Sequence, residues 1–161
     1  MHQLTMTVLM TPTMSNFTGN VHGGAILKLL DEVAYACASR YAGSYVVTMG
    51  VDQVTFRQPI HVGELVTFLA SVNLTGRSSM EVGIKVIAED IQGKSVRHTI
   101  SCYFTMVALG ADRKPVSVPL FEPGTLEERQ WQAAAIKRRD LRQQLEREHQ
   151  AIKASVVAPE A

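Results

Sequence analysis

One aspartate stands apart in the first predicted helix of this chain. Apolar residues recur there at three- and four-residue spacing, which predicts a helix with one face in a core: Ile26, Leu29, Leu30, Val33 and Cys37. Asp31 lies outside this stripe, and helical steps from it reach only apolar or small residues, Leu27, Ala34 and Ala38. Apolar surroundings disfavour the charged form of a carboxylate, and such acids are enriched in functional sites. Asp31 is therefore a candidate catalytic acid or base, and the alternative is an aspartate that is solvated or paired with a distant residue.

A polar, glycine-rich loop runs from Asn16 to Gly24 directly into this helix. Gly23 and Gly24 relax the steric limits on the backbone, so a ligand can approach the main chain closely there. The first N–H groups of a helix lack intrahelical acceptors, and the helix dipole places partial positive charge beside them. The loop is therefore a candidate binding site for developing negative charge, and the alternative is a structural turn.

Length and composition indicate a globular, single-domain protein. The chain has 161 residues, of which 46% are hydrophobic and 19% charged, enough for one core of useful size. Its 16 basic and 15 acidic residues give a formal charge of +1, so nucleic acid and anionic membranes are not expected partners. The N-terminal residues lack a basic segment followed by an apolar one, and no apolar run approaches the roughly 18 residues of a membrane span. We expect a soluble, cytoplasmic protein.

The sequence predicts no metal or redox cofactor. The five histidines show no close ligand spacing, and the glycines form neither a dinucleotide-binding nor a P-loop motif. Cys37 and Cys102 both fall in apolar segments, which predicts buried, inert thiols.

The order of the predicted elements favours an α+β domain. A strand over residues 4–10 ends at Pro12, and the helix follows and ends at Gly43. Four further strands are predicted over residues 45–56, 64–74, 80–88 and 95–109, with a bulge at Gly50 and hairpins at residues 76–79 and 90–93. Because strands and helices do not alternate, a doubly wound parallel sheet is excluded. An antiparallel sheet curled around one long central helix is expected.

The composition changes after Pro119. Thr125 and Glu128 fit a capping box, which predicts a helix from there to about Ile152 and a frayed tail from Val156. We therefore expect a main domain over residues 1–118 and a C-terminal helical extension over residues 119–161. The basic residues of this helix either form a solvated face or contact the phosphates of a ligand.

Four segments of the chain together resemble the hotdog-fold acyl-CoA thioesterases. They are residues 16–24, then Asp31, then residues 47–59 and finally residues 75–82, in the order that this family shows. The resemblance covers about residues 1–115 and is strongest to the bacterial acyl-CoA hydrolases related to the cytosolic brain-type enzyme. The fold of that family agrees with the expected sheet and central helix.

This resemblance implies a shared active site. The catalytic acid of the family, near the helix start, corresponds to Asp31, and its loop asparagine corresponds to Asn16 of the opposite subunit. The N–H group of Gly24, on the same helix as Asp31, corresponds to the donor that polarises the thioester carbonyl. The resemblance also implies a homodimer with a continuous sheet, and hexamers built from three dimers are common among such relatives.

The resemblance also implies where coenzyme A binds. The family segment that contacts the nucleotide corresponds to Gly76, Arg77, Ser78 and Ser79. Arg57 is a second candidate phosphate ligand, because guanidinium can engage phosphate with two donors, or an exposed charge at a strand end. Gly23 offers a contact surface, and His22 either assists the chemistry or holds the turn.

The expected activity is hydrolysis of fatty acyl-CoA to the free acid and coenzyme A. Asp31 would activate water as a general base or attack the carbonyl as a nucleophile, and the sequence does not choose between them. A non-catalytic acyl-CoA-binding regulatory protein is the alternative. A hotdog dehydratase is a third reading, but it calls for a catalytic histidine paired with an acid in a different arrangement.

Overall fold

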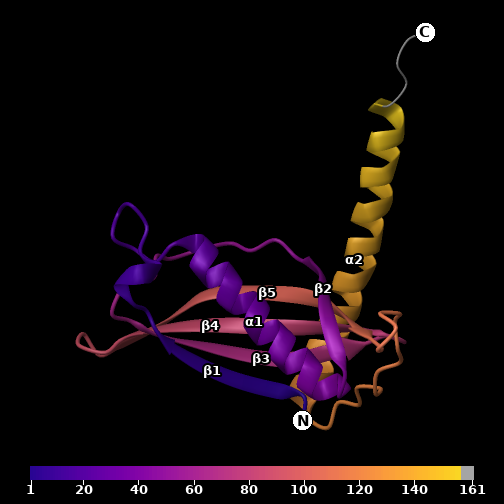
Figure 1. Ribbon diagram of the computed structural model, residues 1–161, viewed down its shortest axis with the longest axis horizontal. Coiled ribbons are helices and arrows are strands. Elements are labelled where there is room, and N and C mark those ends of the chain that lie inside the picture. The colour runs from indigo at the N-terminus through magenta and orange to yellow at the C-terminus, as the bar shows by residue number, and fades with distance from the viewer. Residues whose placement is uncertain (157–161) are drawn as a thin grey trace. The chain divides into compact units, whose positions relative to one another are not determined.

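A computed structural model describes residues 1–156, which divide into two compact units. The first unit, residues 1–121, contains a short 3-10 helix at Pro12–Met14 and six larger elements: β1 (Gln3–Leu9), α1 (Gly23–Ala42), β2 (Tyr45–Val51), β3 (Leu65–Thr75), β4 (Ser79–Asp90) and β5 (Ser95–Leu109). The second unit contains α2 (Leu126–Val156) (Figure 1).

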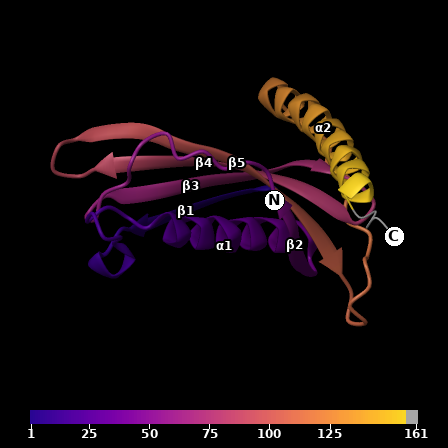
Figure 2. The same ribbon diagram turned by 90° about the horizontal axis from the view of Figure 1, so that it is seen from above.

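The first unit is an antiparallel sheet with α1 against one face. The five strands lie in the order β1-β3-β4-β5-β2, and every neighbouring pair is antiparallel. Figure 2 shows α1 running along one face of β1, β3, β4 and β5. The predicted α+β class and the β3-β4-β5 meander are confirmed.

The apolar stripe of α1 forms the centre of the core. The helix buries one continuous face, made of Ile26, Leu30, Val33, Ala34, Cys37 and Ala38. Alternate residues of the strands meet this face, since successive side chains of a strand point to opposite sides, and Val66, Phe68 and Val82 are fully buried among them. Burial of this face is what fixes the orientation of α1, and with it the direction in which Asp31 points.

Both cysteines are buried free thiols, as predicted. Burial raises the pKa of Cys37 to about 11 and that of Cys102 to about 12. Because the thiolate is the reactive form, neither side chain is suited to nucleophilic chemistry near neutral pH.

The ends of α1 and β2 follow local backbone chemistry. Gly43 adopts a left-handed conformation with φ of 67° and donates its N–H to the carbonyl of Ser39, which ends α1 where the sequence predicted. The pairing of β2 with β5 shifts between Thr48 and Gly50, which confirms the predicted bulge. The prediction that this strand continues to residue 56 is wrong, because β2 ends at Val51.

The segment after β2 crosses to the start of α1 instead of continuing the strand. The ring of Phe56 packs over Gly23, and a Cβ atom added to Gly23 would lie 3.6 Å from that ring. This distance is an ordinary van der Waals contact, so the ring lies directly against the start of α1. The Asp52 N–H still donates to the Tyr103 carbonyl of β5 at 2.9 Å, and the chain leaves the sheet after it. Arg57 then lines the same hollow as Asn16 and Asn20 of the loop that precedes α1.

The start of α2 is the predicted capping box. The Thr125 hydroxyl accepts from the N–H of Glu128 at 3.1 Å, and a Glu128 carboxylate oxygen accepts from the N–H of Thr125 at 3.1 Å. The helix extends past Ile152 to Val156, and residues 157–161 of the predicted tail lie outside the described residues. Over residues 1–156, α2 included, none of the helices has the length and apolarity needed to span a membrane.

A buried ion pair fixes the turn between residues 59 and 64. The Arg97 guanidinium donates to both carboxylate oxygens of Glu64, at 2.6 and 2.7 Å, and to the carbonyl of Pro59 at 2.7 Å. Glu64 is only 5% exposed and also accepts from the backbone N–H of His61 at 2.8 Å. Burial opposes ionisation of Glu64, but the hydrogen bonds from Arg97 and His61 outweigh it and lower the pKa of this carboxyl.

The lowered pKa of Glu64 predicts an acid-sensitive contribution to stability. A carboxyl whose pKa is lower in the folded state stabilises the protein above its unfolded pKa, and this stabilisation is lost as pH falls through the folded value. We expect wild type to have a larger free energy of unfolding than Glu64→Gln at about pH 7. This difference should shrink as the pH falls below 4.5, the ordinary pKa of a glutamate. Urea unfolding of both proteins across this pH range measures the difference in free energy.

Glu32→Gln serves as the control, because its carboxylate is half exposed and only 3.8 Å from the exposed Lys28 ammonium. If the difference in free energy of unfolding between wild type and Glu64→Gln stays constant down to about pH 3, the ion pair contributes no charge-dependent stability.

Candidate active site

Asp31 is held by a threonine of the edge strand. The Thr48 hydroxyl donates to Asp31 Oδ1 at 2.6 Å, across 17 positions of sequence. Both residues are exposed in the single chain and line an open hollow of about 370 Å³, walled by Tyr35, Tyr45 and Val47. Tyr35 and Tyr45 meet edge to face, with ring centroids 6.1 Å apart.

Two expectations about Asp31 are corrected by this geometry. In the single chain Asp31 is not surrounded by apolar side chains, because the core-facing stripe turns it toward the exposed end of β2. It also lies nine residues into α1, in the third turn rather than near the helix start. Sequence reasoning missed Thr48, whose signal was present: it lies two residues after the buried Val46, on the same face of β2.

The Asn16 side chain is locked into its own loop. Its Oδ1 atom accepts from the Thr18 N–H at 2.9 Å, the Thr18 hydroxyl at 2.8 Å and the Asn20 N–H at 3.1 Å. The backbone N–H of Asn16 donates to the Asn20 carbonyl at 2.7 Å. Because three donors converge on Oδ1, the amide orientation is determined, and Nδ2 is the group left to donate outward.

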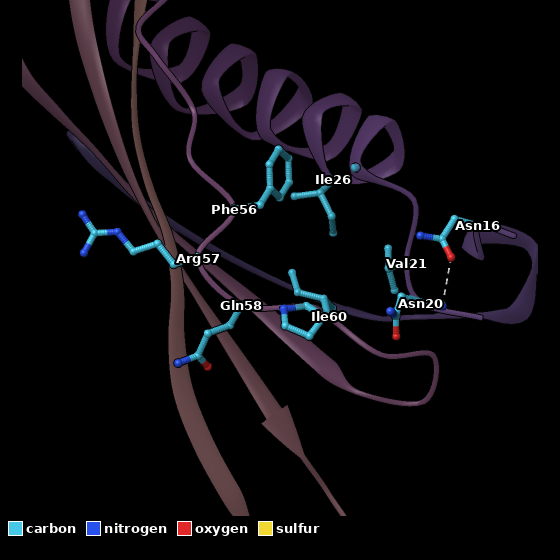
Figure 3. Close-up of a pocket in the computed structure, with 10 residues that line it drawn as sticks. Asn16, Asn20, Val21, Ile26, Phe56, Arg57, Gln58 and Ile60 are labelled. Carbon is cyan, nitrogen blue, oxygen red and sulfur yellow. Dashed lines mark hydrogen bonds between the residues drawn. The ribbon is translucent and has the colours of Figure 1, made fainter. Parts of the chain in front are cut away.

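Asn16 borders a second hollow, of about 290 Å³. Figure 3 shows its Nδ2 atom on the side of this hollow, while Phe56 and Ile26 approach one another across it. Gly23 and Arg57 also belong to the lining, and in Figure 3 the guanidinium of Arg57 extends away from Asn16. The hollow therefore combines an apolar wall with the amide side chains of Asn16, Asn20 and Gln58 and the exposed cation of Arg57.

His22 caps the start of α1. Its Nδ1 atom accepts from the backbone N–H of Gly24 at 2.8 Å. A backbone N–H can only donate, so Nδ1 carries no proton and the donor of the ring is Nε2. Of the two roles considered for His22, the structure shows the one that holds the turn. The Gly24 N–H, expected to polarise a carbonyl, already has an acceptor within its own chain.

The hairpin at residues 76–79 lies at the same end of the sheet as Thr48. The Gly76 N–H donates to the Ser79 carbonyl at 2.8 Å, and the carbonyl of Ser78 accepts from β5 at 2.9 Å. Met80, which follows the hairpin, pairs with Met106 of β5, and Met106 pairs with Thr48 of β2. One row of paired residues therefore crosses the sheet from the hairpin to β2. Arg77 is exposed on this hairpin.

The candidate residues therefore fall into two groups within one chain. The loop that carries Asn16 contacts the segment just before β3, since the Asn20 side chain bonds to His61 at 2.8 Å. Thr48 lies in the row of residues at the other end of β3. Gly24 and Asp31 are seven residues apart on one helix, which separates them by about 10 Å at 1.5 Å per residue. One chain does not bring both to a single carbonyl group.

Within residues 1–156, no three histidine, cysteine or acidic side chains are grouped closely enough to hold a metal ion. The polar side chains that line the two hollows include the Asp31 carboxylate, the Thr48 hydroxyl and the Asn16 amide.

Comparison with known proteins decides the family. A model of the family described as "Thioesterase superfamily" matches residues 18–94. The Helicobacter pylori protein VdlD is 50% identical over 140 residues, covering 87% of this chain and 80% of that protein. YkhA of Bacillus subtilis, named as an uncharacterized acyl-CoA thioester hydrolase, is 33% identical and covers 88% of this chain and 82% of that protein. This chain belongs to the thioesterase superfamily.

Solved structures place this thioesterase among acyl-CoA hydrolases of the same fold. A hexameric acyl-CoA thioesterase without ligand is 34% identical, with a TM-score of 0.85 over 88% of this chain and 91% of that one. The Staphylococcus aureus acyl-CoA hydrolase, in complex with butyryl coenzyme A, coenzyme A and coenzyme A disulfide, is 28% identical, with a TM-score of 0.87 over 97% of this chain and 95% of that one. Variants of that hydrolase with an aspartate, an asparagine or a threonine replaced by alanine have also been solved.

The His22 cap predicts a measurable loss of stability. Replacing His22 with alanine removes the acceptor of the Gly24 N–H, and loss of an N-cap costs about 1 kcal/mol. His22→Asn keeps a side-chain acceptor that is favoured at this position and is expected to recover most of that free energy. Denaturant unfolding of the three proteins measures the effect, and equal stability of wild type and His22→Ala would contradict the capping role.

Proposed function

We propose that this thioesterase hydrolyses fatty acyl-CoA at sites formed between two chains. One chain supplies Asn16 and the start of α1, and the other supplies Asp31 and Thr48. The observation that carries this proposal is the separation of these groups within one chain, because the length of helix between Gly24 and Asp31 is fixed. A second copy is the simplest source of the missing half of each site.

The spacing of the replaced residues in the Staphylococcus aureus hydrolase supports this choice of residues. Its substituted asparagine lies 15 positions before its substituted aspartate, and its substituted threonine lies 17 positions after that aspartate. Asn16, Asp31 and Thr48 have the same residue types at the same spacings in this chain. Thr48 therefore joins the candidate set on two independent grounds, the spacing and its hydrogen bond to Asp31.

In this proposal Asp31 acts as a general base toward water. Thr48 donates to Oδ1 of Asp31, which orients the carboxylate and leaves Oδ2 to accept a proton from the attacking water. The water oxygen bonds to the thioester carbonyl carbon, the C–S bond then breaks, and the coenzyme A thiolate takes up the proton. Direct attack by Asp31 would instead need an anhydride intermediate that water must resolve, so the two routes are distinguished by whether solvent oxygen enters the protein carboxylate.

The negative charge that develops on the carbonyl oxygen would be met by two donors from the other chain. Nδ2 of Asn16 is the donor left over once Oδ1 is bound to its loop. The N–H of Gly24 is the second donor, and the carbonyl oxygen would share it with His22 Nδ1 or displace that ring. Preorganised donors at this position stabilise the transition state more than the ground state.

Coenzyme A would be bound by backbone and cationic groups outside the reacting centre. Arg77 is exposed on the hairpin at residues 76–79, and a guanidinium can engage a phosphate with two donors. Arg57 is exposed at the margin of the Asn16 hollow and is the second cation that phosphate could reach. Phe56 and Ile26 give this hollow an apolar wall, which suits an acyl chain or a pantetheine arm.

The exposed edge of the sheet supports a dimer. β2 is an edge strand, and it exposes large apolar side chains, with Tyr45 at 59%, Met49 at 66% and Val51 at 47%. An unpaired apolar edge of this kind favours pairing with another strand. We propose that two β2 strands pair to continue the sheet across a homodimer, and that three dimers form a hexamer.

Substitution of Asp31 and Thr48 tests the proposed chemistry. We expect Asp31→Asn to lower kcat by at least about 100-fold, the usual range of general base catalysis, while the protein stays folded. Thr48→Val should lower kcat by about tenfold, because a hydrogen bond to a charged group is lost, and Thr48→Ser should retain most activity. Release of free thiol from acyl-CoAs of increasing chain length is the measurement, with circular dichroism as the folding check.

Glu32→Gln is the matched control, since this carboxylate lines the same hollow one residue from Asp31. Full activity of folded Asp31→Asn would refute the assigned base. Saturable acyl-CoA binding by wild type without thiol release would instead identify the alternative, a non-catalytic regulatory protein.

A further inference from the structure

A chain of hydrogen bonds connects the buried Glu64–Arg97 pair to the Asn16 loop. Arg97 lies at the start of β5, and its guanidinium binds both Glu64 and the carbonyl of Pro59. Glu64 in turn accepts from the backbone N–H of His61 at 2.8 Å. The turn at residues 59–64 is therefore held from both ends by one ion pair.

The same turn holds the loop that carries Asn16. The His61 ring bonds through Nδ1 to Asn20 Oδ1 at 2.8 Å, and because an amide oxygen only accepts, Nδ1 is the donor. The Val21 N–H donates to the carbonyl of Ile60 at 2.8 Å. Asn20 then donates its own N–H to Asn16 Oδ1 at 3.1 Å. Each step is a direct hydrogen bond between neighbouring groups.

Burial makes the far end of this chain rigid. Glu64 is 5% exposed, and the Arg97 side chain is 23% exposed, so the pair is shielded from water and bound through two parallel hydrogen bonds. Asn16 and Asn20 are only half buried and His61 is exposed, whereas Val21 of the same loop is buried in the core. The polar contacts that begin at Arg97 therefore act together with the packing of Val21 in ordering the Asn16 loop.

We propose that Arg97, Glu64 and His61 are positioning residues for Asn16. They touch no reacting atom and act by fixing the place from which Nδ2 of Asn16 donates to the substrate. This inference rests on the proposed function, because it assumes that Asn16 binds the thioester carbonyl. A small displacement of such a donor is costly, since catalysis requires the reacting groups to be held in close register.

A double-mutant comparison with Asn16 tests the proposal. Arg97→Lys keeps the charge but loses the paired donors, and it should lower kcat by roughly tenfold in the wild-type background. In the Asn16→Ala background the same change should have less than about a twofold effect, because the donor that it positions is absent. An equal effect in both backgrounds would overturn the proposal and leave Arg97 a general stabilising residue.

Two further variants separate positioning from stability. His61→Ala removes the contact with Asn20 at an exposed side chain, so it should fold and show the same coupling to Asn16. Ile100→Val is the control, because it lies on β5, is 1% exposed and destabilises the core without touching the network. Ile100→Val should lower kcat by the same small factor in the wild-type and the Asn16→Ala backgrounds.

Hydrogen exchange gives a readout that does not depend on activity. The amides of Thr18, Asn20 and Val21 should exchange about tenfold faster in Arg97→Lys and His61→Ala than in wild type, and should be unchanged relative to the rest of the chain in Ile100→Val. Unchanged exchange of these amides would overturn the positioning role even if kcat falls. Faster exchange in the two variants, together with a wild type that does not hydrolyse acyl-CoA, would refute the proposed function while the link from Arg97 to the loop remains.

Discussion

The fixed rise of an α-helix is the constraint on which this site depends. Gly24 and Asp31 share α1, and a buried apolar face of that helix holds it against the sheet. The helix cannot bend to bring its N-terminal donors to its own aspartate, since about 10 Å of regular helix lies between them. Under the proposed mechanism, the same burial that makes α1 stable leaves the two halves of the site at different places in one chain. Assembly with a second copy would bring two such halves together without any strain in the helix.

The polar groups around the helix start show how the loop is prepared for binding. Three donors occupy Oδ1 of Asn16, and the ring of His22 occupies the N–H of Gly24. These contacts remove the alternatives that a free asparagine amide would have, so that Nδ2 is the group presented outward. The loop is held in turn by residues 59–64, which the Glu64–Arg97 ion pair binds through two parallel hydrogen bonds. In our proposal this pair fixes the position of the loop in addition to its contribution to stability.

Local patterns predicted the parts of the fold whose chemistry is local. The stripe on α1, the end at Gly43, the bulge at Gly50 and the capping box of α2 each depend on residues within a few positions of one another. The strand after the bulge was predicted too long, because the packing of Phe56 on Gly23 joins residues 33 positions apart and outweighs strand propensity. Asp31 was singled out because it interrupts a periodic pattern. Thr48, Glu64 and Arg97 were missed because their roles arise from contacts across 17 and 33 positions, which periodicity does not report.

The most direct test of a shared site is complementation between two impaired variants. When Asn16→Ala and Asp31→Ala chains are unfolded together, refolded and assayed for thiol release, a mixed dimer contains one site with both replacements and one site with neither. Random pairing should then restore about a quarter of the wild-type activity, although each variant alone retains only a small residual activity. Activity of the mixture no higher than the sum of the separate variants would show that Asn16 and Asp31 act within one chain, and would contradict a site shared between two chains.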